Sequence, residues 1–210
     1  HASSDLWACG ATVDSAQAIV TLPALESGDQ QELLAQTLAG VRSVLQEQGA
    51  SLIGGHTLEA RSDPPKPVEL GLQLTLCVNG RSHGTAWRKG GIQPGDALLL
   101  SRPLGTGVLF AAAMAGAVPP AAIDGVLAVM TCSQHQLLDQ LQPHWDEIHA
   151  CTDITGFGLL GHLGEMLQSS APLQVKLFGD SIPAYPQALE LLERGLASSL
   201  APANRRSWHW

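Results

Sequence analysis

Residues 151–163 read Cys-Thr-Asp-Ile-Thr-Gly-Phe-Gly-Leu-Leu-Gly-His-Leu and place one acidic residue directly before a glycine-punctuated helix start. Apolar and β-favouring residues at 148–151 predict the end of a strand, and the spacing of the leucines that follow predicts an amphipathic helix. A carboxylate at the end of a strand can bind Mg²⁺, while the free N–H groups of the next helix turn face a phosphate. Asp153 or Thr155 could equally cap that helix. A metal-phosphate site and a helix cap are therefore both open interpretations.

The composition is that of a globular protein. The chain has 210 residues, of which 45% are hydrophobic and 14% charged, enough for one large domain or one and a half smaller ones. No apolar run reaches the eighteen or so residues needed to cross a bilayer, and no signal peptide opens the sequence. We therefore expect a soluble, cytoplasmic protein without a membrane partner.

The charge balance limits the class of partner. The formal net charge is −8, with 11 basic residues, which argues against an electrostatic grip on nucleic acid. A small anionic substrate could still bind if Mg²⁺ supplied local positive charge. The four cysteines are widely spread and show neither a disulfide framework nor zinc-ligand spacing, so we expect free, buried thiols.

Hydrophobic periodicity predicts helices and strands in alternation along the chain. The expected helices cover residues 3–9, 29–49, 108–115, 121–141, 155–168 and 186–194, and the expected strands cover residues 16–22, 51–53, 68–78, 97–100, 148–151 and 173–177. A charged, proline-rich loop is expected at residues 61–67. This alternation predicts a layered α/β (α+β) architecture. The glycine-rich, polar stretch at 80–95 predicts a boundary between two lobes, residues 1–80 and 81–210.

Two further motifs have both a functional and a structural interpretation. Asp5 lies in the first turn of the first expected helix, where it could ligate a metal or simply favour the helix dipole. Gly54-Gly55-His56-Thr57 ends an expected strand with two glycines that let a ligand approach the backbone, followed by an imidazole and a hydroxyl. A tight turn with a structural histidine would give the same pattern.

Other candidate motifs are weaker. Gly105-Thr106-Gly107 precedes a helix but lacks the Lys-Ser/Thr ending of a Walker loop, so a strand-to-helix turn is expected. His162 stands one to two turns into its helix and is expected to be a packed or surface residue. The sequence contains neither a Gly-x-Ser-x-Gly elbow nor a reactive-cysteine signature, and no catalytic nucleophile is assigned.

Taken together, these motifs resemble the selenophosphate synthetase (selenide, water dikinase) family, of the aminoimidazole ribonucleotide synthetase-like superfamily. Residues 4–10 resemble the family's Ser-Asp-(hydrophobic)-(aromatic)-Ala-x-Gly run, and residues 54–57 its Gly-Gly-His-Ser/Thr turn. Residues 102–107 resemble its Lys-Pro-Leu-Gly-x-Gly turn. Residues 152–163 match its Thr-Asp-Val-Thr-Gly-Phe-Gly-Leu-Leu-Gly-His-Leu run with one change, at Ile154.

The resemblance implies a fold, a reaction and a set of site residues. The fold would be two lobes, each a mixed sheet covered by helices, with the first lobe incomplete, and the protein a homodimer joined through the first lobe's sheet. The reaction would convert ATP, selenide and water into selenophosphate, AMP and phosphate with Mg²⁺. Asp5 and Asp153 would be metal ligands, with Asp5, Gly55, His56 and Thr57 contacting the nucleotide.

The sequence also departs from the family pattern. The family's upstream glycine-rich segment, with its Cys or selenocysteine and its Lys, is missing, as is its downstream Asp-Pro-Gln-Thr-Ser-Gly-Gly segment. Arg102 replaces a family Lys. We therefore expect a core fragment that is inactive alone. The alternatives are a sister ATP-dependent kinase or synthetase of the superfamily, and a degenerate, non-catalytic nucleotide-binding or dimerisation module.

Overall fold

The computed structural model describes residues 1–60 and 71–207, and the chain divides into two compact units. Unit 1 comprises residues 1–87 and 134–145, and unit 2 comprises residues 88–133 and 146–210. The loop expected at 61–67 and the start of the strand expected at 68–78 lie outside the described residues. In the part of the chain that the structure describes, no helix is both long enough and apolar enough to span a membrane.

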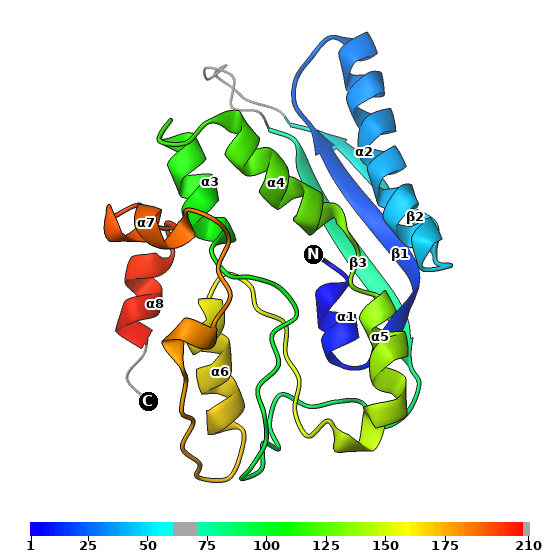
Figure 1. Cartoon of the computed structure of the whole chain (residues 1–210). Helices are drawn as coiled ribbons and strands as arrows, with labels where there is room; N and C mark the ends of the chain where they lie inside the picture. Colours follow the sequence, from blue (N-terminus) through cyan, green and yellow to red (C-terminus); the bar gives the residue numbers. More distant parts are fainter. Residues whose placement is uncertain (61–70, 208–210) are drawn as a thin grey trace. The chain divides into compact units, whose positions relative to one another are not determined.

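Unit 1 is a three-stranded sheet with a long helix on one face (Figure 1). Its elements are α1 (Ser4–Ala8), β1 (Ala11–Leu22), α2 (Ser27–Glu47), β2 (Ser51–Glu59), β3 (Gln73–Ser82) and α5 (Gln136–Leu141). The strand order is β2-β1-β3, with β1 parallel to β2 and antiparallel to β3. The sheet is therefore mixed, as expected for the first lobe.

The core of unit 1 lies between α2 and the central strand. Val41 and Leu45 of α2 pack with Val13 and Ala16 of β1, all buried. The helix ends where Gly49 takes a φ of +67°, and the amide of Ala50 bonds to the carbonyl of Leu45 at 2.8 Å. The leucine and valine periodicity therefore predicted both the buried face of this helix and its glycine end.

Two tryptophan rings pack against each other in unit 1. The rings of Trp87 and Trp145 lie with their centroids 4.3 Å apart, and the Trp145 indole donates to the carbonyl of Thr85 at 3.1 Å. A Cβ at Gly10 would stand 2.5 Å from the Trp145 ring. Residues 134–145 thereby pack with the N-terminal part of the chain.

Unit 2 is built mainly from helices. Its elements are α3 (Thr106–Met114), α4 (Pro120–Thr131), α6 (Gly158–Gln168), α7 (Ala188–Glu193), α8 (Ala201–Ser207) and two short 3₁₀ turns, Gly179–Ser181 and Gln142–Glu147, the second of which crosses from unit 1 into unit 2. Leu109 and Ala112 of α3 pack with Val126 of α4 and with Ala188 and Leu191 of α7. These buried residues form one hydrophobic core.

The strands expected in the second lobe, at 97–100, 148–151 and 173–177, are wrong as regular strands. A strand requires repeated hydrogen bonding along a neighbour, and these segments lack such a ladder: one bond, from the amide of Cys151 to the carbonyl of Arg88 at 2.9 Å, accompanies 148–151. Elsewhere in the described part of unit 2, Leu104 and Ala184 form an isolated parallel bridge. The α/β class is confirmed, but the described sheet lies in unit 1.

One expected helix is split. The sequence predicts a single helix over 121–141, whereas α4 ends at Thr131 and α5 begins at Gln136. Cys132 is extended, with a ψ of 122°, and its carbonyl accepts a hydrogen bond from the guanidinium of Arg102. The break occurs where the chain leaves unit 2 for unit 1, because α5 packs with a different core from α4.

Candidate functional site

The segment that carries Asp153 is an extended stretch leading into α6. Asp153 is half-buried, and the segment is held at its start by the bond between Cys151 and Arg88. At its other end, the carbonyl of Gly156 accepts a hydrogen bond from the side-chain amide of Asn204 at 2.9 Å. The acidic residue therefore lies on a segment that is fixed at both ends, directly before a helix.

His162 ties this segment to its own helix. The backbone amide of Thr155 donates to Nε2 of His162 at 3.1 Å, and the Thr155 hydroxyl oxygen lies 3.2 Å from the same nitrogen. The histidine is 5% exposed. Of the two expected placements, packed or at the surface, the structure shows the packed one. The sequence did not predict the bond to Thr155, because two residues seven positions apart in one helix lie two turns apart. Here residues 155–158 form a turn, closed by the bond from the Gly158 amide to the Thr155 carbonyl at 3.0 Å, and Gly158 has a φ of +69°.

An ion pair lies beside the other nitrogen of this imidazole. Nζ of Lys89 donates to Oε2 of Glu165 at 2.7 Å, and this hydrogen bond holds the pKa of the Glu165 carboxyl below its ordinary value of 4.5. The same oxygen lies 3.6 Å from Nδ1 of His162. Lys89, Glu165, His162 and Thr155 therefore form a continuous chain of polar contacts that leads to the Asp153 segment.

Asp5 occupies the first turn of α1, where its carboxylate is exposed. A negative charge at this position also stabilises the helix dipole. Leu6, the next residue, packs on the core between α2 and the sheet. The apolar neighbour therefore fixes the helix on unit 1 and leaves the carboxylate at the surface.

The structure corrects the interpretation of residues 54–57 as a turn. They lie inside β2, which continues to Glu59 because it pairs with β1 through eight residues. Gly55 has a φ of +151°, and a Cβ there would overlap the backbone of Ala18. The glycine is therefore required by the approach of two strands, whatever ligand it also contacts.

His56 and Thr57 lie on opposite faces of the sheet. Consecutive strand residues point to opposite faces. Thr57 pairs with the buried Val20, two residues before Glu59, which contacts Gln30 of α2. Thr57 therefore belongs to the face that α2 covers, and the exposed His56 belongs to the other face.

The predicted site residues divide between the two units. Asp5, Gly55, His56 and Thr57 belong to unit 1, and Asp153 belongs to unit 2. Among residues 1–60 and 71–207, no group of three or more His, Cys, Asp or Glu side chains could hold a metal ion. A cation held by a single carboxylate completes its coordination with substrate oxygens and water.

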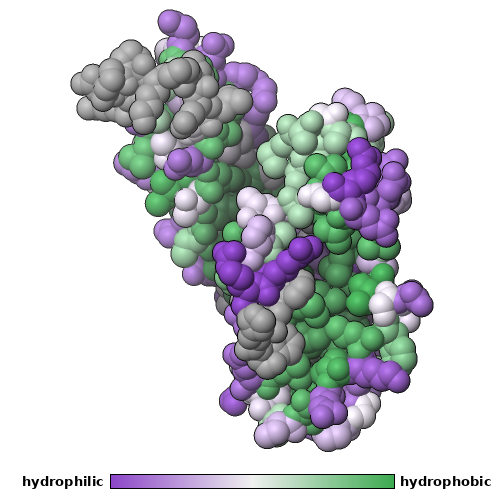
Figure 2. All heavy atoms as spheres, turned by 90° about the vertical axis from the view of Figure 1, so that its left-hand side faces the viewer, coloured by the Kyte–Doolittle hydropathy of each residue, from purple (hydrophilic) through white to green (hydrophobic). Residues whose placement is uncertain are grey.

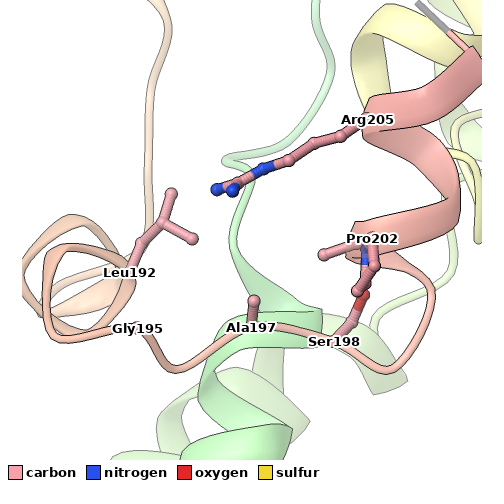
Figure 3. Close-up of a pocket in the computed structure, with 7 residues that line it drawn as sticks. Leu192, Gly195, Ala197, Ser198, Pro202 and Arg205 are labelled. Carbon is pink, nitrogen blue, oxygen red and sulfur yellow. The ribbon is translucent and has the colours of Figure 1, made fainter.

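A pocket elsewhere in unit 2 was not predicted from the sequence. It has a volume of about 500 Å³ and is lined by residues of α7, α8 and the loop between them: Leu192, Gly195, Ala197, Ser198, Ala201, Pro202 and Arg205. Figure 3 shows the guanidinium of Arg205 extending from α8 toward Leu192 across this space. Figure 2 shows broad apolar areas on one face of the chain. Met114, Phe178 and Leu189 are among the exposed large apolar residues of unit 2.

Comparison with known proteins decides the family. The description "AIR synthase related protein, N-terminal domain" matches residues 1–78, and "AIR synthase related protein, C-terminal domain" matches residues 93–195. The chain belongs to the AIR synthase-related family. The two matches together cover both units and all five predicted site residues.

Two similar curated proteins carry the same name. The proteins named selenide, water dikinase are 34% identical over 206 residues in Pelobacter propionicus and 36% identical over 205 residues in Desulfitobacterium hafniense. Each alignment covers 98% of this chain but 55% and 56% of the respective relative. The AIR synthase-related chain therefore spans about half the length of the curated relatives that it matches.

A solved structure supports the same fold. The crystal structure of the hydrogenase maturation protein HypE superposes with a TM-score of 0.75 and 17% sequence identity. The superposition covers 94% of this chain and 60% of that chain. At this identity the likeness shows the AIR synthase-related fold alone.

Proposed function

We propose that the protein to which this chain belongs synthesises selenophosphate from ATP, selenide and water, releasing AMP and phosphate. One observation carries the proposal. Residues 152–163, which resemble the family's most specific run, comprise a non-helical segment that carries Asp153 and the first turns of α6, and the Thr155–His162 bond joins the two parts. The identity of 31–36% to proteins named selenide, water dikinase supports the same reaction.

The two acidic residues fit a role as ligands of Mg²⁺. Carboxylate oxygens are the hard ligands that Mg²⁺ prefers, and this ion is usually bound through one or two carboxylates together with substrate phosphates. Asp5 is exposed and Asp153 is half-buried, so each offers one carboxylate from a separate unit. When bound, Mg²⁺ would neutralise the charge of the polyphosphate during transfer.

The chain's own residues would position the nucleotide. Phosphoryl transfer depends mainly on positioning and on electrostatic stabilisation. The fixed Asp153 segment would hold the carboxylate in place, and the close packing of Gly55 against Ala18 would keep β2 rigid beside the nucleotide. Because His56 and Thr57 face opposite sides of the sheet, we propose that one of them contacts the nucleotide by its side chain and the other through its backbone.

The test compares carboxylate variants of the intact protein. Asp5→Asn and Asp153→Asn should each lower selenide-dependent AMP formation by about 100-fold, the loss typical of one electrostatic contact to a transition state. Asp14→Asn is the matched control, since Asp14 is also exposed and its ion pair with Arg81 is long, at 3.6 Å. The assay follows AMP with and without selenide at several Mg²⁺ concentrations.

Each alternative has its own result. AMP or ADP formation that does not respond to selenide would move the assignment to a sister kinase or synthetase of the family. Unchanged Mg²⁺-dependent nucleotide binding in both variants would show that neither carboxylate takes part in it; the helix-cap interpretation of Asp153 is already excluded, because α6 begins at Gly158 with Phe157 as its N-cap. In that case the non-catalytic module would be the better interpretation.

We also propose that a second copy of the chain covers the sheet face opposite α2. Ile19 of the central strand and Leu58 of the neighbouring edge strand lie on this face and are each 45% exposed, and such exposed large apolar residues are typical of an interaction surface. Ile19→Lys should lower the molar mass measured by light scattering from dimer to monomer. Val44→Lys, on the exposed side of α2 and 39% exposed, is the control that should leave the mass unchanged.

A further inference from the structure

We propose that His162 is a positioning residue, whose neutral imidazole, protonated on Nδ1, fixes the segment that carries Asp153. The expected effect on turnover rests on the proposed function. The protonation state of His162 and its contact with the segment do not depend on that function. Nothing in the match to the relatives assigns a role to this histidine. The inference starts from its contacts within unit 2.

The hydrogen bond to Thr155 determines which ring nitrogen carries the proton. Nε2 lies 3.1 Å from the Thr155 backbone nitrogen, whose N–H can only donate. The accepting ring nitrogen must therefore have a free lone pair, so the neutral ring is protonated on Nδ1. An imidazolium, which donates from both nitrogens, could not accept this bond.

The surroundings of Nδ1 agree with that protonation state. Nδ1 is buried and has no hydrogen-bond partner within the described part of the chain. Oε2 of Glu165 lies 3.6 Å from Nδ1 and already accepts a hydrogen bond from Lys89 at 2.7 Å. A proton on Nδ1 points toward this carboxylate, whereas a bare lone pair there would face a negative charge.

The packing around the ring makes the contact specific to this segment. The ring of Phe157 is tilted by 44° against the imidazole, with the centroids 5.7 Å apart. Gly161 permits this, because a Cβ at that position would stand 2.8 Å from Cβ of Phe157. The segment therefore contacts the first turns of α6 through the backbone amide and the hydroxyl of Thr155, both close to Nε2 of His162, and through one ring contact. Asp153 lies two residues before the bonded amide.

Loss of the acceptor would release the segment. Loss of one hydrogen bond costs about 0.5–1.5 kcal/mol net, and Thr155 is itself exposed, so in His162→Leu its amide should bond to water and the segment should lose the contact that fixes it. Asp153 would then sample several positions. His162→Gln keeps a side-chain oxygen that can reach the position of Nε2, and it should restore the bond. His83→Leu makes the same change at an exposed histidine of unit 1 and is the matched control.

The first test uses nuclear magnetic resonance on the intact wild-type protein, which requires no variant to fold. Nitrogen-15 shifts should show Nδ1 of His162 protonated and Nε2 unprotonated. Amide exchange should then be about 10-fold faster at Thr155 in His162→Leu than in the wild type, with His162→Gln and His83→Leu unchanged, as expected for the loss of one part-buried hydrogen bond.

The second test measures turnover. In His162→Leu the kcat of selenide-dependent AMP formation should fall about 10–100-fold, the range for loss of a group that orients a metal ligand. His162→Gln should recover most of this activity.

Two results would overturn the proposal directly: a proton on Nε2 of His162, or a Thr155 amide that stays protected from exchange in His162→Leu. The proposal would also be overturned if His162→Gln protected the Thr155 amide from exchange and yet lost as much kcat as His162→Leu. A different result would separate the two proposals. If the wild type showed the proton on Nδ1 and the expected amide exchange at Thr155 but no selenide-dependent turnover, the proposed function would be wrong and the fixed segment would stand.

Discussion

A side chain at Gly55 would overlap the backbone carbonyl of Ala18, the residue that faces it across the parallel strands β1 and β2. Gly55 also has a φ of +151°, which residues with a Cβ rarely adopt. The two neighbouring glycines of this strand therefore differ in how much room they leave for a side chain. A Cβ at the neighbouring Gly54 would meet no atom within 4 Å among the described residues.

Gly55→Ala should lower the free energy of unfolding by more than about 2 kcal/mol, because the strands must separate or the backbone must change conformation. Gly54→Ala should change the free energy of unfolding by less than about 0.5 kcal/mol, the range for exposed sites. Urea denaturation of both variants provides the comparison. Equal stability of the two variants would show that the strands can adjust without cost.

Gly10→Ala should destabilise the protein more than Gly49→Ala does. Both glycines have a φ near +70°, so each alanine costs about 1–2 kcal/mol in backbone strain. At Gly10 the new Cβ would also stand 2.5 Å from the Trp145 ring, whereas Gly49 has open space. This overpacking should add about 1–3 kcal/mol, and the loss of tryptophan fluorescence intensity during thermal unfolding measures the difference.

The ion pair between Lys89 and Glu165 should show a small, pH-dependent coupling energy. Both side chains are more than 40% exposed, so a double-mutant cycle with Lys89→Met and Glu165→Gln should give about 0.2–1 kcal/mol at neutral pH. The folded-state pKa of Glu165 lies below its ordinary value, so this stability is present above that value and is lost as the pH falls through the folded pKa. The same cycle repeated in the acid range should approach zero. A coupling that persists there would show that the pair does not depend on the Glu165 charge.

Asp96→Asn should reduce the acid sensitivity of unit 2. The amide of Gln93 donates to Oδ2 of Asp96 at 2.8 Å, and Nδ1 of His149 lies 2.8 Å from Oδ1. The first of these contacts is the main reason why the pKa of Asp96 lies below its ordinary value of 3.8. The carboxylate therefore stabilises the fold above that value and stops doing so as the pH falls through its folded pKa. Melting temperatures of wild type and variant should differ at neutral pH and converge in acid, and parallel curves would contradict this role.

The sequence predicted the elements whose signals are local. The spacing of Val41 and Leu45, with Gly49 after them, marked the buried face and the end of α2. The run after residue 158 similarly marked α6. Both helices form because their apolar stripes recur at the helical period, which depends on residues only a few positions apart. For the same reason the sequence placed Asp153 directly before a helix.

Long-range pairing decided what the sequence missed. β2 continues through His56 to Glu59 because β1 supplies a hydrogen-bonding neighbour, although the two glycines predicted a turn. Residues 148–151 have strand composition but lack such a ladder, since a strand is stable only with repeated backbone bonds to a neighbour. Strand assignment therefore depended on chain segments that are distant in sequence.

The candidate site divides in the same way. The sequence by itself determined the residue types, namely the two carboxylates, the glycine-rich strand and the twelve-residue run around Asp153, because these are fixed by composition and order. Only the tertiary structure decided that Thr155 bonds to His162, that Glu165 is held by Lys89, and that His56 and Thr57 face opposite sides of the sheet. Those facts depend on a reversed backbone at Gly158, on contacts across 76 residues and on strand register, and none of these is encoded in the spacing of neighbouring residues.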